Sequence, residues 1–240
     1  NIFKTKPTLK ELIPEGFVDI HSHILPGIDD GAKNVKESLE LISEMKKIGF
    51  SKIIGTPHTY PGLYENTNKT ILKSYDLVIA KLKKNITIDY ASEYMLDYSI
   101  LTKIEKKSLL TLSEKYVLVE MSYFAPPYNL YEILFELITN KYVPILAHPE
   151  RYRFLHNNFK EYEKLKKVGC LFQINLLSLT SLYGPDVLKI SKKLYSRDLV
   201  DFTGSDIHNH RHLDYFNEKV KIDGLDNLNK SLNNNIKIFK

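Results

Sequence analysis

The chain has 240 residues, of which 43% are hydrophobic and 26% are charged, as in an ordinary soluble globular protein. Its formal net charge is +5, but the surplus lysines are spread in pairs along predicted helices and form no basic arm. This distribution gives no indication of nucleic-acid binding and leaves only a mild preference for anionic substrates.

The single cysteine, Cys170, precedes an apolar run and is interpreted as a core residue. One cysteine excludes an internal disulfide framework and fits a cytoplasmic protein. No signal segment opens the chain, and no apolar run approaches the length of a membrane span, so membrane insertion is not expected. Because the sequence starts with Asn1 rather than Met, the possibility of a removed leader segment stays open.

Residues 1–16 contain Pro7, Pro14 and Gly16 and are predicted to form an N-terminal arm, with residues 17–240 forming one domain. Apolar runs predict buried strands around residues 17–20, 53–54, 86–91, 116–119, 143–147, 171–174 and 199–203. Apolar residues at helical spacing predict helices at about 35–48, 68–84, 100–105, 131–140, 159–168 and 186–195. The Asn/Lys-rich tail after Asp223 carries late apolar residues and is expected to dock partly on the body.

This alternation gives about seven strand-then-helix units with no flexible linker between them. Short apolar strands alternating with helices favour an α/β fold with a parallel sheet. Seven or eight such units in this length predict a barrel, with every strand's carboxyl end on one face.

Metal-capable side chains stand at those predicted strand ends. His21 and His23 are two residues apart, so an extended chain turns both imidazoles to the same side. Asp30 lies in the following loop, although Asp29-Asp30-Gly31 is also typical of a turn. The other candidates at strand ends are His58, Glu93, Glu120, His148, Asp206 and His208. Nine ligands exceed the needs of one ion, so the set predicts two or three, and imidazole with carboxylate suits Zn, Fe or Mn better than Mg or Ca.

These residues form motifs that resemble a known family. The motifs are Asp19-x-His21-x-His23, Asp30-Gly31, Thr56-Pro57-His58, Glu93, Glu120, His148-Pro149-Glu150-Arg151-Tyr152 and Ser205-Asp206-x-His208-Asn209. In order and spacing, from about Val18 to Asn209, they resemble the PHP (polymerase and histidinol phosphatase) superfamily. Within it, they are similar to the metal-dependent protein tyrosine phosphatases of bacterial capsule and exopolysaccharide loci.

The resemblance implies a distorted (β/α)7 barrel with a trinuclear centre at the carboxyl ends of its strands. It implies one ion held by His21, His23, Glu93 and Asp206, a second shared by Glu93 and held by Glu120 and His148, and a third held by Asp30, His58 and His208. Arg151 is implied as a phosphate ligand; a surface salt bridge is the alternative. In the family, a second phosphate-binding arginine usually follows the Asp-x-His motif by a few residues. Here the only arginine near that motif is Arg211, at a different distance from it in the sequence.

The implied reaction is hydrolysis of phosphotyrosine on a protein, expected to be a bacterial tyrosine kinase of polysaccharide synthesis or export. A metal-activated hydroxide attacks phosphorus, and His58 or His208 could protonate the leaving group, although both are expected chiefly as ligands. Tyr128, in a Pro-Pro-Tyr loop after Glu120, is the favoured substrate-facing residue. Cys170 lacks the following arginine of cysteine-based phosphatases.

Three other functions stay open from the sequence. The first is a small-molecule phosphatase of the histidinol-phosphate type, which would prefer that substrate to aryl phosphates. The second is a metal-binding regulatory scaffold with little turnover. The third is a nuclease, which the modest and dispersed basic charge disfavours.

Overall fold

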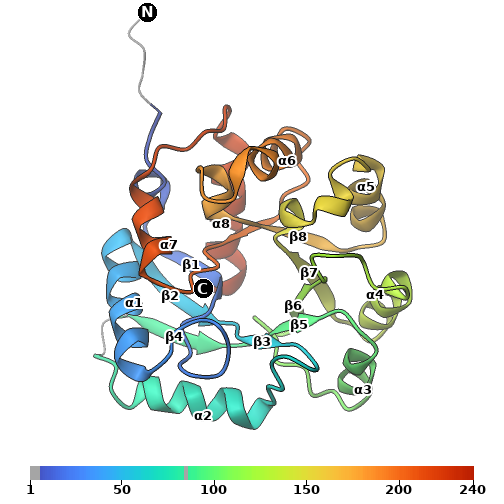
Figure 1. Cartoon of the computed structure of the whole chain (residues 1–240), viewed down its shortest axis with the longest axis horizontal. Coiled ribbons are helices and arrows are strands. Elements are labelled where there is room, and N and C mark those ends of the chain that lie inside the picture. Colours follow the sequence, from blue (N-terminus) through green and yellow to red (C-terminus); the bar gives the residue numbers. More distant parts are fainter. Residues whose placement is uncertain (1–5, 84–85) are drawn as a thin grey trace, which may run out of the picture.

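The computed structural model describes residues 6–83 and 86–240 (Figure 1). Its strands are β1 (Phe17–Ser22), β2 (Phe50–Gly55), β3 (His58–Thr59), β4 (Thr87–Tyr90), β5 (Glu93–Met95), β6 (Tyr116–Glu120), β7 (Val143–Ala147), β8 (Leu171–Asn175) and β9 (Phe202–Gly204). Its α-helices are α1 (Val35–Ile48), α2 (Asn68–Ile79), α3 (Ser99–Glu105), α4 (Leu130–Thr139), α5 (Phe159–Lys167), α6 (Gly184–Ser196), α7 (His210–Asp214) and α8 (Asp226–Phe239). Short 3-10 turns lie at Lys10–Leu12, Pro149–Arg151, Arg153–Leu155, Leu176–Leu179 and Tyr215–Asn217.

All strand pairings are parallel, in two sheets ordered β1-β2-β4 and β3-β5-β6-β7-β8-β9. The chain passes from the first sheet to the second twice, between β2 and β3 and between β4 and β5. At the first crossing Pro57 has no N–H to offer, and its carbonyl accepts from the N–H of Glu93 at 3.1 Å. Counting β2/β3 and β4/β5 as two broken strands gives seven positions, and the α/β prediction with parallel strands is confirmed.

The first and last strands meet at their carboxyl ends. Ser22 pairs with Ile207 in a parallel bridge, and the N–H of His23 donates to the carbonyl of Ile207 at 2.9 Å. Nearer their amino ends, a side chain from α8 fills the seam between β1 and β9. The amide nitrogen of Asn235 donates to the carbonyls of Val18 and Thr203 at 2.9 Å and 2.7 Å. The predicted docking of the tail on the body is confirmed, since α8 covers this edge (Figure 1).

Several predicted elements have different bounds, among them β2, which starts at Phe50 rather than 53, and two of the differences have a local cause. Helix α2 ends at Ile79 rather than near residue 84. The N–H groups that follow it donate to carbonyls three residues back instead of four, as Lys81 does to Val78. Lys84 is outside the described residues. Strand β9 starts at Phe202 rather than 199, because the carboxylate of Asp201 accepts the Phe172 N–H in place of a strand carbonyl.

The described part of the predicted arm is docked rather than free. Thr8 pairs antiparallel with Lys219, and the N–H of Leu9 donates to the carbonyl of Glu218 at 2.9 Å. Leu9 and Cys170 are both buried in the core. None of the helices described is both long and apolar enough to cross a membrane.

Candidate metal centre

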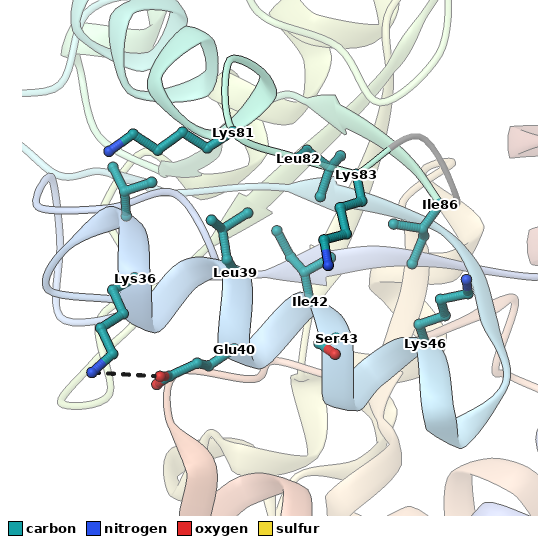
Figure 2. Close-up of a pocket in the computed structure, with 11 residues that line it drawn as sticks. Lys36, Leu39, Glu40, Ile42, Ser43, Lys46, Lys81, Leu82, Lys83 and Ile86 are labelled. Carbon is teal, nitrogen blue, oxygen red and sulfur yellow. Dashed lines mark ion pairs between the residues drawn. The ribbon is translucent and has the colours of Figure 1, made fainter.

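Two hollows in the surface have very different chemistry. One, of about 470 Å³, lies between α1 and residues 81–83 and 86, and is lined mainly by leucine, isoleucine and lysine side chains (Figure 2). Among its described lining residues Glu40 is the one carboxylate, which faces Lys36, and none carries an imidazole. The other, of about 310 Å³, opens at the carboxyl ends of the strands and is lined by four histidines, two aspartates and Arg151 among others. The candidate site is therefore the smaller hollow.

Two imidazole nitrogens of the cluster each lie within 3.5 Å of the same two carboxylate oxygens. His21 Nε2 lies 3.3 Å from His23 Nε2, 3.2 Å from Glu93 Oε2 and 3.3 Å from Asp206 Oδ1. His23 Nε2 lies 3.5 Å from the same Glu93 oxygen and 3.3 Å from the same Asp206 oxygen. Ligands about 2.0–2.1 Å from a tetrahedral ion lie about 3.3–3.4 Å from one another. The spacing within His21, His23 and Asp206 fits one ion, and Glu93 faces the same two imidazoles.

Glu93 extends the cluster to a second position. Its Oε1 lies 3.0 Å from His148 Nε2, while its Oε2 lies 3.1 Å from His58 Nδ1. The same His58 nitrogen lies 2.7 Å from Glu120 Oε1. Glu93, Glu120, His58 and His148 thus surround the region beside the first four atoms.

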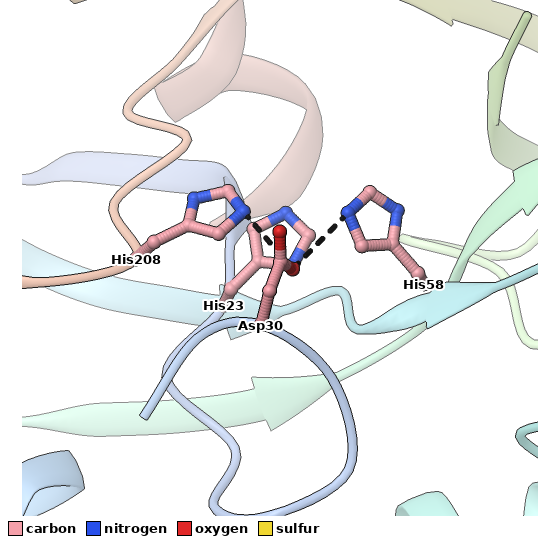
Figure 3. Close-up of side chains that lie close together, drawn as sticks. All are labelled: His23, Asp30, His58 and His208. Carbon is pink, nitrogen blue, oxygen red and sulfur yellow. Dashed lines mark ion pairs between the residues drawn. The ribbon is translucent and has the colours of Figure 1, made fainter. Parts of the chain in front are cut away.

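A third group faces solvent. Asp30 Oδ1 lies 3.5 Å from His58 Nε2 and 3.4 Å from His208 Nε2, and His23 belongs to the same group (Figure 3). His58 turns its two nitrogens to different groups, so it stands between the second and third positions rather than wholly in the third. All nine ligands predicted from the sequence are brought to this one end of the barrel.

Polar residues that the sequence analysis did not assign orient the ligands. His21 Nδ1 lies 2.6 Å from Gln173 Oε1, and His23 Nδ1 lies 2.8 Å from Asp29 Oδ2. Such contacts fix the ring orientation of a metal-binding histidine. Asp29 was recognisable only as the neighbour of Asp30, and nothing in the sequence distinguishes Gln173 from other polar strand residues. Gly31 is required here, because a Cβ would lie 2.0 Å from the His23 carbonyl oxygen.

Two ligands sit on unusual backbone. His148 has φ 35° and Asp206 has φ 53°, in the left-handed region that non-glycine residues rarely occupy. His148 directly follows β7, and Asp206 lies two residues beyond the end of β9. At both places the turn directs the side chain over the end of the barrel. Such strain is maintained where the surroundings hold it in place, and it clusters at functional sites.

The cluster has strongly shifted pKa values. Burial raises the pKa of Glu93, but His21 and His58 outweigh it and hold that pKa well below its usual range. Burial and the Glu93 charge raise the pKa of Glu120 to about 7. Burial lowers the pKa of His148 to about 4, so its imidazole is neutral and fit to be a ligand.

Two buried polar atoms of the centre are poorly satisfied by the protein. His148 Nδ1 has no hydrogen bond among the described residues, and Glu93 Oε2 has only the imidazole nitrogens of His21, His23 and His58 beside it. Such groups are costly to bury unless something satisfies them. With the donor set of imidazole and carboxylate, this makes the residues present fit divalent metal ions.

Arg151 lies above the ligands and is held on three sides. Its Nη1 donates to Asp206 Oδ2 at 2.8 Å, and its guanidinium carbon lies 4.9 Å and 4.4 Å from the ring centres of Tyr123 and Tyr183. Asn175 also donates to Asp206 Oδ2, at 2.6 Å. The side chain is 24% exposed and lines the cavity, so a group bound there would meet it.

The other two predicted substrate residues lie elsewhere. Arg211 is exposed on α7 and Tyr128 is fully exposed in the loop after β6, and neither lines the cavity. His212 and Asn209 line it in the place expected for Arg211. Helix α7 was not predicted, and it is this helix that turns His212 rather than Arg211 inward.

Two tyrosine-protein phosphatases are similar to this chain along most of its length. The chain is 31% identical over 196 residues to the tyrosine-protein phosphatase YwqE of Bacillus subtilis, covering 80% of this chain and 77% of YwqE. It is 32% identical over 202 residues to the tyrosine-protein phosphatase CpsB of Streptococcus pneumoniae, covering 80% and 83%.

Solved structures are also similar to this chain. A crystal structure from work on YwqE and CpsB, described as unique metal-dependent tyrosine phosphatases, matches with a TM-score of 0.77 and 29% identity over 83% of this chain and 84% of that one. Histidinol phosphate phosphatase of Lactococcus lactis matches with a TM-score of 0.53 and 15% identity over 84% and 91%, which shows a shared fold alone. A family model for capsular polysaccharide synthesis proteins, CpsB/CapC, matches residues 17–215. The chain belongs to the CpsB/CapC family.

Proposed function

We propose that the chain is a metal-dependent protein-tyrosine phosphatase that hydrolyses phosphotyrosine on proteins. The observation that carries the proposal is the placement of Arg151 on a cavity that five of the nine candidate ligands also line, namely Asp30, His58, His148, Asp206 and His208. A phosphoryl group carries the negative oxygens that both a divalent ion and a guanidinium bind. The relatives named as tyrosine-protein phosphatases support the same reaction.

Two or three divalent ions, of Mn, Fe or Zn, are proposed for the centre. His21, His23, Glu93 and Asp206 would hold one ion, Glu93, Glu120 and His148 a second, and Asp30, His58 and His208 a third. Bound there, such ions polarise a phosphoryl oxygen and lower the pKa of water to give a nucleophile at neutral pH.

The protein's own groups bind and orient the substrate. Arg151 offers a planar fork to two phosphoryl oxygens, and the stacked Tyr123 and Tyr183 rings keep that fork in place. His58 and His208 have partners at both ring nitrogens, which favours a ligand role for them over proton transfer to the leaving group. A phenolate leaves without a strong acid, so no such transfer is required.

The physiological substrate proposed is a phosphotyrosine-bearing bacterial tyrosine kinase of polysaccharide synthesis, in the cytoplasm. The family's role in capsular polysaccharide synthesis supports this context. A reducing compartment also suits the free, buried Cys170.

The test is turnover of a phosphotyrosine peptide, para-nitrophenyl phosphate and histidinol phosphate by protein stripped of metal and then given Mn²⁺, Fe²⁺ or Zn²⁺. We expect metal-dependent phosphate release from the peptide, which EDTA abolishes. Iodoacetamide should leave the rate unchanged, because burial raises the pKa of Cys170 to about 12. A strong preference for histidinol phosphate would instead identify a small-molecule phosphatase.

A further inference from the structure

The loop between β6 and α4 exposes two large aromatic side chains beside the metal centre. Phe124 is 95% exposed and Tyr128 is fully exposed, while Tyr123, directly before Phe124, lines the cavity. Aromatic side chains held in water contribute nothing to the core, and apolar side chains gathered on one surface are typical of binding sites. The loop therefore continues the wall of the cavity outward onto the surface.

Neighbouring loops add to the same edge. Strands β3, β5 and β6 are adjacent and parallel, so the loops after them emerge side by side at the end where the metal ligands lie. Leu63, in the loop after β3, is 61% exposed, and Tyr98, after β5, is 60% exposed. We call Leu63, Tyr98, Phe124 and Tyr128 the apolar rim.

The loop after β6 is fixed at both ends. The N–H of Met121 donates to the hydroxyl of the buried Tyr152 at 2.9 Å, and the N–H of Leu130 donates to the carbonyl of Pro127 at 3.1 Å. Pro126 and Pro127 restrict the backbone between them. Residues 121–131 carry no charged side chain. The segment of the rim that carries Phe124 and Tyr128 is thus preorganised and uncharged, and preorganisation lowers the entropic cost of binding.

We propose that the apolar rim binds the polypeptide on either side of the phosphotyrosine, through apolar and aromatic residues next to it. This rests on the proposed function and names its substrate class. The cavity of about 310 Å³ is at the small end for a ligand site, so it has room for the phosphorylated side chain but not for its neighbours. Those neighbours cross the rim, where an uncharged surface selects apolar residues over acidic ones.

The test compares three substrates: a phosphotyrosine peptide flanked by Phe, Leu and Pro, a matched peptide flanked by Ser and Gly, and para-nitrophenyl phosphate. The wild type should prefer the apolar peptide. Phe124→Ala should lower kcat/KM for that peptide about tenfold relative to para-nitrophenyl phosphate, mainly through KM, as expected for loss of a central aromatic contact. Phe135→Ala is the matched control, because Phe135 is 62% exposed on α4, outside the rim.

Other outcomes overturn the proposal in distinguishable ways. Equal kcat/KM for the two peptides, or an unchanged ratio in both Phe124→Ala and Phe124→Ala/Tyr128→Ala, would reject recognition by the rim and leave the phosphatase activity standing. An unchanged ratio with a shift from dimer to monomer in sedimentation would assign the rim to a second copy of the chain. Hydrolysis of para-nitrophenyl phosphate with neither peptide cleaved would reject the proposed function itself.

Discussion

Among single residues, Arg151 has contacts that suit a planar guanidinium. Its guanidinium carbon lies over the rings of Tyr123 and Tyr183, and Nη1 donates a hydrogen bond to Asp206. Stacking and a forked hydrogen bond both require a planar group. Arg211, exposed on α7, has neither the stacking nor a place on the cavity.

Replacing these two arginines should therefore have unequal effects. We expect Arg151→Ala to lower kcat/KM for a phosphotyrosine peptide about a hundredfold, the scale of losing one preorganised donor to the transition state. Arg151→Lys should recover little of it, and Arg211→Ala should stay within about twofold of wild type. Steady-state kinetics with metal-replete protein measures all three. A larger loss in Arg211→Ala than in Arg151→Ala would show that the phosphoryl group binds nearer α7.

Glu150 shows a different use of a buried carboxyl group. Its Oε1 accepts from the N–H of Asn175 at 3.0 Å and from the hydroxyl of Ser178 at 2.6 Å, tying the turn before Arg151 to the end of β8. Burial, only partly offset by these bonds, raises the pKa of Glu150 from 4.5 to about 7. The folded state therefore binds more protons than the unfolded state between these two values.

Stability should consequently fall as pH rises through this window. The cost of ionising Glu150 is absent below its unfolded pKa and complete above its folded pKa of about 7, and amounts to about 3 kcal/mol. Glu150→Gln keeps an acceptor and cannot ionise, so its stability relative to wild type should rise between about pH 5 and pH 8. Urea unfolding of both proteins at the two pH values measures the difference. A constant difference would mean that Glu150 ionises freely in the folded protein.

Among secondary-structure elements, helix α8 closes the barrel with one side chain. Asn235 donates to Val18 and Thr203, and its oxygen accepts from the Thr203 N–H at 3.2 Å. Asn235→Ala would leave these buried backbone groups unpaired, and we expect it to lower the free energy of unfolding by about 2–4 kcal/mol. Asn233→Ala, exposed on the same helix, should change it little. Equal unfolding midpoints for the two variants would mean that water replaces the Asn235 amide.

Much of this architecture was predictable because its strands are short apolar runs that end in histidine or carboxylate. The apolar runs before His21, Glu120 and His148 predicted both a strand and the position of a ligand at its end. The breaks before β3 and β5 were not predictable, because at each the chain crosses from one sheet to the other and this crossing leaves no local sequence pattern. Asp29, Gln173 and Asn235 were missed for a related reason: their partners are distant in the sequence, and a polar residue does not reveal its partner.

For the whole molecule, metal and fold stability are linked. The centre joins ligands from β1, β3, β5, β6, β7 and the segment after β9, so an ion bound only by the folded state stabilises the entire ring. We expect EDTA to lower Tm by roughly 5–10 °C and added Mn²⁺ or Zn²⁺ to restore it. His21→Ala should lower Tm and remove most of the response to metal. A Tm that does not depend on chelator, in protein shown by elemental analysis to lose its metal, would show that the side chains alone hold the ring together.

The seam beside Asn235 also bears on how the protein is made. The first strand carries His21 and leads to His23, the last leads to Asp206 and His208, and the side chain that joins the two strands comes from α8, later still in the sequence. A chain still being synthesised has its earliest candidate ligands long before it has the latest ones and the helix that fills the seam between their strands. An ion held jointly by ligands of the first and last strands would therefore bind only after the segment that follows β9 has been synthesised.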